Sequence, residues 1–502
     1  MGQRDARKPK DVVYSASYLR KMQLTKFTNM PHQNEALARS KDYLGFAWFL
    51  ETGLGKTKLA LDNALYLWYL QKIQGLLVVA PKGAYRTWTD IEIPKLMPDM
   101  PYLLAYWSAG ASGEELKKME RLFSSGSIFK IFVVNIEAFS TRYGWKMAER
   151  FMTSYKVMWV IDESTCIKNP KAQRTKKILE LKDKAEYKRI MSGYPVIKLP
   201  QGLFSQFNFL QDNPLGFKSY YAFKNCFQIH REILVQNRRI QIVVGVQNEE
   251  LLNHRLQKSS LRYKKEDCLK DLPPKIYEQR IIELTPEQKK MYEDLRRNAF
   301  LMLEREPIVT APMVITRRIK LHQIVCGFLI PDKALNSPTL ELPNNRLSAL
   351  LELLEEHDGK VIVWAGYAHL IRQIYSALTK AYGSNSSAMY YGPTGNNDRP
   401  RIQKEFQDSK HPLRFFVGNP ASGKFALTLT AARLVVYYAN REDLEARYQS
   451  EDRCHRKGQL NSVTYIDLIA PKTVDETIYK NLMDGKTIAD RILDGQSWRE
   501  LL

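Results

Sequence analysis

The chain has 502 residues, about three times the size of an average domain, so we expect several folding units. Hydrophobic residues make up 44% and charged residues 26%, with only 25 Gly and 23 Pro, which excludes disordered, collagen-like and fibrous proteins. Lys and Arg outnumber Asp and Glu by 76 to 54, a formal net charge of +22 that predicts a polyanionic partner, nucleic acid or an anionic lipid surface. Extra lysine that serves only solubility is the alternative.

The cysteines and the apolar runs indicate the cellular compartment in which the protein acts. The five cysteines lie far apart without a C-x-x-C pair, so neither a disulfide framework nor a zinc cluster is indicated. No apolar stretch follows the basic start, Ala6 spoils a myristoylation pattern, and no run of 18 apolar residues occurs. We therefore expect a reducing compartment, cytoplasmic or, in a eukaryote, nuclear, no membrane contact, and nucleic acid rather than lipid as the partner.

The first part of the chain alternates buried strands with helices. A basic segment, 1–30, precedes short apolar runs that are typical of parallel strands in a doubly wound α/β sheet. These runs are Gly45–Leu50, Leu76–Ala80, Phe132–Asn135, Val157–Ile161 and Arg189–Ser192. We assign 31–200 to a first lobe.

The middle of the chain, 201–344, loses this alternation and is predicted to be a mainly helical insertion and linker, with a hairpin pattern around Glu232–Val244. A second α/β lobe is predicted over 345–470, and residues 471–502 are predicted to form one or two amphipathic helices. The predicted strands of the second lobe are Val361–Ala365, Met389–Tyr391, Arg414–Val417, Leu434–Tyr438 and Val463–Ile469.

A glycine-rich turn between a strand and a helix predicts a phosphate site. In FLETGLGKTK, Gly53 and Gly55 allow backbone N–H groups to close around phosphate oxygens, Lys56 adds charge, and the Thr57 hydroxyl can hold Mg²⁺. Leu50 stands where the usual pattern begins with glycine. A turn that binds nothing is the alternative.

Two further patterns extend this site. Asp162 and Glu163 end a buried strand, where two adjacent carboxylates are costly unless a cation or a reacting water uses them. We expect Asp162 to hold Mg²⁺ and Glu163 to orient or deprotonate the attacking water. Gln449, Arg453 and Arg456 have spacings of four and three, which predicts one helix face whose arginines reach a γ-phosphate.

With these motifs in place, the chain resembles the SNF2 (Swi2/Snf2) family of superfamily-2 helicase-like motors, in its compact bacterial or phage form. The resemblance covers about Pro31 to Leu493. Segments in the family's order carry it: MPHQ, LLVVAPKGAYRTW, FVVNIEAF, MSGYPVIKLP, DLPPKIYEQRIIELTPEQKKMY, TRRIKLHQIVCGFL, GKVIVWAGY, SGKFALTLTAARLVVYY and QSEDRCHRKGQ.

The resemblance implies two RecA-like lobes, ATP and Mg²⁺ in a cleft, and sequence-nonspecific contact with DNA. The ATP site then comprises Gln33, Thr52, Gly53, Leu54, Gly55, Lys56, Thr57, Lys58 and Asp162, with Arg453 and Arg456 completing it from the second lobe. Trp88 belongs to the first DNA-contacting motif, and the expected DNA-binding residues are Lys82, Arg86, Asn135, Tyr367, Thr394, Arg399, Lys424 and Thr428.

This chain departs from the family pattern at a few places. Thr165 stands where the family usually has His, Tyr194 replaces a frequent Thr, and Lys424 and Ala426 follow Gly423 where small residues are frequent. None of these differences removes a catalytic side chain. They concern instead how contact with DNA is coupled to ATP hydrolysis.

These features predict a monomeric, DNA-stimulated ATPase that translocates on duplex DNA and remodels branched DNA by fork reversal, branch migration or unwinding. The hairpin, with basic Arg231, Arg238 and Arg239, is either a wedge at DNA junctions or a brace for the first lobe. Two other functions remain open: an RNA-polymerase-recycling or RNA-directed ATPase, and a DNA-binding scaffold with a silent nucleotide site.

Overall fold

The computed structural model describes residues 24–108, 110–124, 126–141, 143–196, 199–235, 238–305, 311–331, 338–395, 398–422 and 427–494. The predictions for most of the basic N-terminal segment, for the hairpin turn Gln236–Asn237, for Lys424 and for 495–502 lie outside this part of the chain.

The chain divides into two units. Unit 1 contains residues up to Arg231, the stretch Ile242–Lys270 and the end of the chain from Thr487, and unit 2 contains Glu232–Gln241 and Asp271–Lys486. Each unit is built around its own parallel sheet, as expected for two doubly wound, RecA-like lobes.

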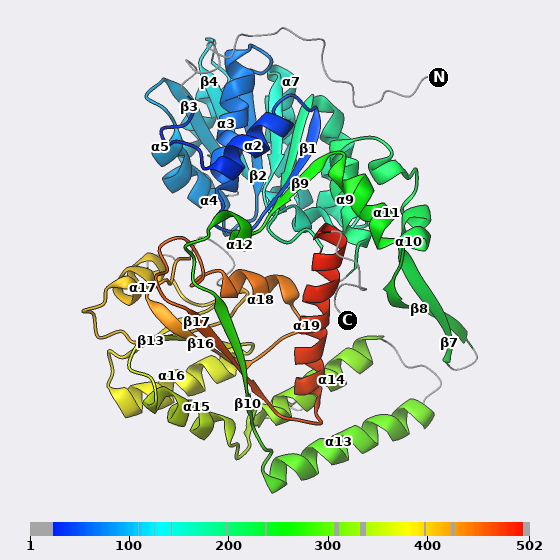
Figure 1. Cartoon of the computed structure of the whole chain (residues 1–502), viewed down its shortest axis with the longest axis vertical. Helices are drawn as coiled ribbons and strands as arrows, with labels where there is room; N and C mark the ends of the chain where they lie inside the picture. The colour runs from blue at the N-terminus through cyan, green and yellow to red at the C-terminus, as the bar shows by residue number, and fades with distance from the viewer. Residues whose placement is uncertain are drawn as a thin grey trace. The chain divides into compact units, whose positions relative to one another are not determined.

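A seven-stranded sheet with the order β3-β4-β2-β5-β6-β1-β9 forms the centre of unit 1, and all of its strand pairs are parallel (Figure 1). The strands are β1 (Gly45–Leu50), β2 (Gly75–Ala80), β3 (Tyr102–Trp107), β4 (Phe129–Asn135), β5 (Val157–Ile161), β6 (Tyr187–Met191) and β9 (Ser260–Tyr263).

Helices cover both faces of this sheet. Successive side chains of a strand point to opposite faces, so Phe46 and Trp48 of β1 join one core and Ala47 and Phe49 the other. The helices α2, α3 and α5 pack on the first face, and α7 to α10 pack on the second. The helices of unit 1 are α2 (Pro31–Ser40), α3 (Lys56–Tyr69), α4 (Tyr85–Thr87), α5 (Ile93–Leu96), α6 (Gly113–Arg121), α7 (Gly144–Ser154), α8 (Gln173–Leu181), α9 (Gln201–Leu210), α10 (Tyr220–Phe227), α11 (Glu249–Gln257) and α12 (Lys265–Cys268).

The sheet of unit 2 has six parallel strands in the order β10-β17-β16-β13-β15-β14 (Figure 1). Helices α15 and α16 cover one face and α17 the other. The strands are β10 (Lys275–Ile281), β13 (Lys360–Ala365), β14 (Ser387–Tyr390), β15 (Phe415–Gly418), β16 (Ala432–Ala439) and β17 (Val463–Ile469). The helices are α13 (Pro286–Arg305), α14 (Ala311–Val325), α15 (Arg346–Glu355), α16 (Ala368–Tyr382), α17 (Asp398–Gln407), α18 (Leu444–Glu451) and α19 (Val474–Asp494), the last of which extends beyond Lys486.

Two small antiparallel sheets complete the fold. Strands β7 (Gln228–Val235) and β8 (Arg238–Val246) form the hairpin that the sequence predicted, and β11 (Phe328–Leu329) pairs with β12 (Leu340–Glu341). None of the helices in the described ranges is both long and apolar enough to cross a membrane.

The fold confirms the strands of both predicted sets, with ends that differ by at most three residues, and three strands of the two parallel sheets were missed. The segment 201–344 is not only helical, because β9 and β10 from this segment form an edge of the unit 1 and unit 2 sheets respectively. Strand β3 forms the other edge in unit 1. An edge strand has one neighbour and a wetter environment, so its sequence lacks the continuous apolar run that marks a central strand.

Candidate functional site

The glycine-rich turn of unit 1 connects β1 to α3. Gly53 and Gly55 have φ angles of 95° and 83°, in the left-handed region that glycine enters without a Cβ clash. Gly55 immediately precedes α3, and no side chain caps the helix there, so the first N–H groups of α3 are available to an anion. A Cβ at Gly55 would also collide with the amide of Gln33.

Three polar groups shape this turn. Lys56 Nζ donates to the carbonyl of Leu50 at 3.0 Å, which holds the lysine back across the turn. The carbonyl of Leu54 accepts from Gln33 Nε2 at 3.0 Å and lies 3.0 Å from His32 Nε2. Gln33, predicted as part of the ATP site, therefore lies against the turn, and His32 is a neighbour that the sequence prediction did not name.

The side chain of Lys58, a predicted ATP-site residue, is engaged in a buried ion pair. Its ammonium donates to Asp62 Oδ2 at 2.8 Å and to the side chain of Asn29, and the Asp62 side chain is fully buried. Asp62 also accepts from Thr25. This lysine is thus an ion-pair partner on α3, one helical turn before Asp62, and its charge serves to neutralise a buried carboxylate.

The acidic pair ends β5, two strands from β1 in the sheet. Asp162 is 9% exposed; its Oδ2 accepts from Trp88 Nε1 at 2.9 Å, and its Oδ1 accepts from the backbone N–H of Glu163 at 3.0 Å. Burial raises the pKa of Asp162 above its usual value, while the Trp88 hydrogen bond and the positive charge of Lys56 oppose that rise. The positive charge of Lys56 therefore acts on the Asp162 carboxylate.

Trp88 corrects an expectation. The resemblance placed it in a DNA-contacting motif, but this tryptophan is 2% exposed and its indole supports Asp162. Glu163 takes a left-handed backbone conformation, with φ 48° and ψ 63°, which is uncommon for a residue with a side chain. Such conformations are concentrated at functional sites, where surrounding contacts hold them in place.

The donor set of unit 1 fits a magnesium ion bound together with phosphate. Thr57 and Asp162 offer one hydroxyl and one carboxylate, and Mg²⁺ is usually held by one or two protein oxygens, substrate phosphates and waters. The described residues contain no group of three or more His, Cys, Asp or Glu that could hold a metal alone. Thr57 and Asp162 are thus the residues that would hold Mg²⁺, which would neutralise phosphate charge when bound.

The segment MSGYP begins at the end of β6, beside the glycine-rich turn. A Cβ at Gly193 would lie 3.4 Å from the backbone nitrogen of Thr52. Thr52, a predicted ATP-site residue, therefore has the MSGYP segment as its neighbour. Thr165 and Tyr194, where the chain departs from the family pattern, are both buried.

The three residues of the QSEDRCHRKGQ segment do not share a helix face. Helix α18 ends at Glu451, so only Gln449 is helical, and Arg453 and Arg456 lie in the following turn. The two guanidinium groups nevertheless converge: Arg453 Nη1 and Arg456 Nη1 donate to the carbonyl of Leu427 at 3.3 and 3.2 Å. We call residues 452–456 the arginine turn.

Gln449 and Thr428 lie next to the arginine turn. Arg453 Nε donates to the carbonyl of Gln449 at 3.0 Å, and Arg456 Nη1 donates to Thr428 Oγ1 at 2.9 Å. The Gln449 side-chain oxygen is buried and has no hydrogen-bond partner among the described residues. Thr428, predicted to bind DNA, is therefore an immediate neighbour of a predicted catalytic arginine.

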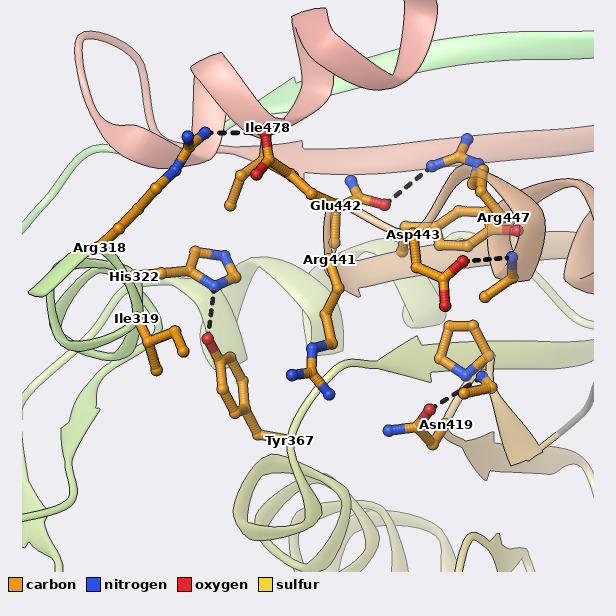
Figure 2. A pocket seen from close by; sticks show the side chains of 15 residues that line it. Arg318, Ile319, His322, Tyr367, Asn419, Arg441, Glu442, Asp443, Arg447 and Ile478 are labelled. Atoms are coloured by element: carbon orange, nitrogen blue, oxygen red, sulfur yellow. Dashed lines mark hydrogen bonds and ion pairs between the residues drawn. The ribbon is translucent and has the colours of Figure 1, made fainter. Parts of the chain in front are cut away.

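Unit 2 also contains a cavity of about 510 Å³ at the carboxyl ends of β13, β15 and β16 (Figure 2). Ligands of open α/β sheets bind outside the carboxyl ends of the strands, where the strand order reverses. Arg318 of α14 and Arg441 after β16 line the cavity, and the Arg441 guanidinium lies 5.6 Å from the ring of Tyr367. Arg318 pairs with Glu442 at 2.9 Å, whereas Arg441 Nη1 makes a long contact of 3.5 Å with the carbonyl of Gly366.

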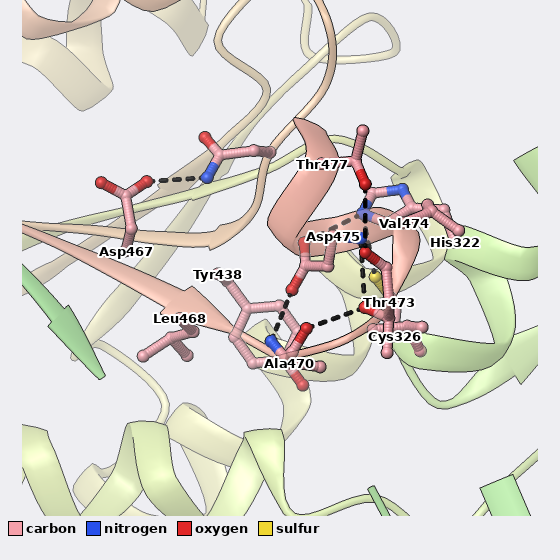
Figure 3. A network of polar contacts seen from close by, with 12 residues as sticks. His322, Cys326, Tyr438, Asp467, Leu468, Ala470, Thr473, Val474, Asp475 and Thr477 are labelled. Carbon is pink, nitrogen blue, oxygen red and sulfur yellow. Dashed lines mark hydrogen bonds and ion pairs between the residues drawn. The ribbon is translucent and has the colours of Figure 1, made fainter. Parts of the chain in front are cut away.

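Tyr367, a predicted DNA-binding residue, connects this cavity to a buried network. Its hydroxyl lies 2.8 Å from His322 Nδ1, and His322 Nε2 lies 3.4 Å from Asp475 Oδ1 (Figures 2 and 3). Asp475 Oδ2 in turn accepts from Arg346 Nη2 at 2.6 Å and from the N–H of Ala470 at 3.0 Å. This network joins α14, α15 and the start of α19 beneath the cavity, so the position of Tyr367 is well defined.

Several of the other predicted DNA-binding residues have partners within their own unit. In unit 1, Lys82 is exposed, Arg86 pairs with Asp90 at 2.9 Å, and the Asn135 side chain accepts from the N–H of Ala138 at 3.0 Å. In unit 2, Arg399 donates to the carbonyl of Thr394 at 3.1 Å, which brings these two residues together. Their contact with DNA remains a prediction.

The sequence prediction missed the supporting partners more than the reactive groups. Three supporting residues were not predicted as site residues: Trp88 at Asp162, Glu451 beside the arginine turn and Arg441 in the cavity. Trp88 and Asp162 are 74 positions apart, so no local spacing reveals their contact. The only available signal was a tryptophan in an otherwise polar segment after β2.

Two protein-family models match consecutive parts of the chain. The SNF2-related domain matches residues 39–340, and the helicase conserved C-terminal domain matches residues 345–458. The first match covers more than half of the chain, and the second contains α18 and the arginine turn.

Individual relatives are distant and longer. YwqA of Bacillus subtilis, whose name is that of an ATP-dependent helicase/translocase, is 23% identical over 84% of this chain and 43% of its own length. The DNA annealing helicase and endonuclease ZRANB3 of Bos taurus is 25% identical over 89% of this chain and 38% of its own. This chain thus spans less than half the length of either relative.

Among solved structures, the SWI2/SNF2 ATPase core of Sulfolobus solfataricus in complex with double-stranded DNA is 22% identical, covers 96% of both chains, and has a TM-score of 0.42. The assignment therefore rests on the family models, which match the two α/β units in order. This chain belongs to the SNF2-related family and carries a helicase conserved C-terminal domain as its second part.

Proposed function

We propose that this protein is an ATP-dependent DNA translocase whose ATP hydrolysis is stimulated by DNA. The observation that carries the proposal is the site of unit 1, where a glycine-rich turn, Lys56 and the buried Asp162 combine in a chain of the SNF2-related family. The uncapped start of α3 binds the phosphates, and Lys56 neutralises their charge. Glu163 orients or deprotonates the attacking water.

The arginine turn completes this site in the proposed mechanism. Arg453 and Arg456 carry permanent charge on planar groups with several donors, which suits the charge that develops on a transferred phosphoryl group. Their convergence on Leu427 within unit 2 supports a shared role. The two units then close on ATP and open after hydrolysis.

DNA is the proposed partner because of charge and family. The net charge of +22 favours a polyanion, and contact through phosphates gives affinity without sequence readout. We propose that the cavity beside Tyr367 contributes to this contact, with Arg441 as a phosphate ligand. Branched DNA is the proposed substrate; the name of ZRANB3 as a DNA annealing helicase is compatible with it.

A nucleic-acid panel tests the proposal. ATP hydrolysis is measured with plain duplex, forked duplex, four-way junction, single-stranded DNA and RNA, with Lys56→Ala as the inactive control. We expect duplex and branched DNA to stimulate most, and we expect fork or junction products on gels with ATP and none with a nonhydrolysable analogue. Strongest stimulation by RNA would favour the RNA-directed alternative, and unchanged activity in Lys56→Ala would favour the DNA-binding scaffold.

A further inference from the structure

The arginine turn is held in place by a strand that begins next to the boundary between the two units. The chain crosses between the two units at several points; one of them lies between Lys270 and Asp271, and β10 starts at Lys275, only a few residues later. Strand β10 is the edge strand of the unit 2 sheet, and it pairs in parallel with β17 from Lys275 opposite Val463 to Ile281 opposite Ile469.

One buried carboxylate connects β10 to the last residue of α18. Glu451 is 0% exposed, and its Oε2 accepts from Tyr277 Oη at 2.7 Å and from Lys275 Nζ at 3.2 Å. Its Oε1 accepts from Arg447 Nε at 2.7 Å. Two cations and a hydroxyl thus surround this carboxylate, so its position depends on β10 as well as on α18.

The same strand also contacts the arginine turn directly. Lys275 Nζ lies 3.5 Å from Oδ1 of Asp452, the residue before Arg453. His455 Nε2 lies 2.7 Å from the carbonyl of Pro273, two residues before β10 begins. The start of β10 therefore touches both sides of Arg453, and His455 adjoins Arg456 in sequence.

The other side of this network is anchored in the sheet. Arg447 donates from Nη2 to Asp467 Oδ2 of β17 at 2.9 Å and from Nη1 to Asn440 Oδ1 at 3.0 Å. The Tyr465 hydroxyl donates to the backbone carbonyl of Glu451 at 2.8 Å. These contacts fix the end of α18 against β17. The remaining contacts of the network come from β10, which begins next to a boundary between the units.

We propose that Lys275 and Tyr277 are positioning residues for the arginines: through Glu451 and Asp452 they hold the arginine turn in its catalytic conformation, and they transmit movement of the linker to it. The inference rests on the proposed ATPase function. Lys270–Asp271 is one of the points where the chain crosses between the units, and the side chains that hold the arginine turn begin only a few residues after it.

The test compares two positively charged side chains of the same strand, Lys275 and Arg280. Lys275→Met removes the ammonium near Glu451, whereas Arg280→Met removes a solvent-exposed ion pair between Arg280 and Glu352 at 3.5 Å. We expect Lys275→Met to lower the kcat of DNA-stimulated hydrolysis about tenfold, with the KM for ATP within about twofold of wild type. Arg280→Met should leave both constants unchanged.

Two conservative variants separate positioning from folding. Tyr277→Phe removes only the hydroxyl that donates to Glu451 and should lower kcat about threefold, and Lys275→Arg should restore most of the activity that Lys275→Met loses. Binding of a fluorescent ATP analogue and the Tm are measured on every variant. Unchanged analogue affinity together with lower kcat is the expected signature of a displaced arginine.

The results distinguish this inference from the proposed function. If wild-type protein shows no DNA-stimulated hydrolysis, the proposed function fails and the inference fails with it. If wild type is active and Lys275→Met has the kcat of Arg280→Met, the inference is overturned while the proposed function stands. A parallel loss of analogue affinity, kcat and Tm in Lys275→Met would also overturn it, because the strand would then serve stability alone.

Discussion

The glycine-rich turn of unit 1 and the arginine turn of unit 2 hold their charged residues in different ways. In unit 1, the backbone positions the charged residue: two glycines with positive φ shape the turn, and a backbone carbonyl accepts a hydrogen bond from Lys56. In unit 2, a buried network of side chains from α18, β17 and β10 surrounds the arginine turn. Local sequence therefore specifies the first site, whereas the second depends on residues brought together by the sheet.

The first prediction contrasts two lysines of the same helix. Lys56→Ala should reduce ATP hydrolysis about 10³-fold with little change in Tm, because its ammonium serves the phosphates. Lys58→Ala should instead cost about 3 kcal/mol of unfolding free energy, because the buried Asp62 loses its cation. Hydrolysis rates and denaturant titrations of both variants check this contrast, and equal loss of stability in the two would contradict it.

The arginine turn should lose catalysis without losing nucleotide. Arg456→Ala is expected to lower kcat about 10²-fold and to leave affinity for an ATP analogue nearly unchanged, because the charge acts on the transition state. Arg456→Lys keeps the charge but not the planar fork and should recover only part of the rate. A full recovery by lysine would show that charge alone is sufficient.

A third prediction concerns the buried acid of unit 1. Burial raises the pKa of Asp162 in the folded protein, so above the usual carboxyl pKa the ionised form makes folding less favourable. Asp162→Asn should therefore raise the Tm of the nucleotide-free protein at pH 7 by about 2–4 °C while abolishing hydrolysis. The difference in Tm should vanish as the pH falls below about 4, where the unfolded carboxyl is also protonated.

The smallest expected effect is at the cavity of unit 2. Arg441→Ala should weaken duplex affinity a few-fold and reduce the salt dependence of binding by about one unit of slope, as for one lost phosphate contact. Arg401→Ala is the matched control, since Arg401 is exposed on α17 and pairs with Asp398 at 2.9 Å and Glu405 at 3.3 Å. Equal salt slopes for the two variants and wild type would exclude Arg441 as a phosphate ligand.

The glycine-rich turn and the acidic pair of unit 1 could be located from the sequence because each is local. Strand β1, two glycines and Lys56-Thr57 occur within the 13 residues from Gly45 to Thr57, and the bounds of β1, β5 and β17 agree with the predicted strands. The acidic pair at the end of β5 follows from the same logic, since carboxyl ends of parallel strands meet at one edge of a sheet. The roles of Lys58 and Trp88 were not predictable, because their partners are a buried aspartate and a residue 74 positions away.

The spacing argument for the arginines failed for a physical reason. Residues four and three apart share a helix face only while the helix continues, and α18 ends at Glu451. The arginines still converge, because the backbone turn at 452–456 directs both side chains to Leu427. The edge strands β9 and β10 were missed in the same way, since their pairing joins segments far apart in the chain.

The sequence by itself determined the two α/β units, the glycine-rich turn, the acidic pair and the basic charge, because strand runs, glycine turns and charge counts depend on neighbouring residues alone. Only the tertiary structure decided which strands close each sheet, which lysine of α3 is neutralised by a buried carboxylate, and what supports Asp162 and the arginine turn. These features depend on contacts between residues distant in sequence, which burial selects and local propensity does not encode.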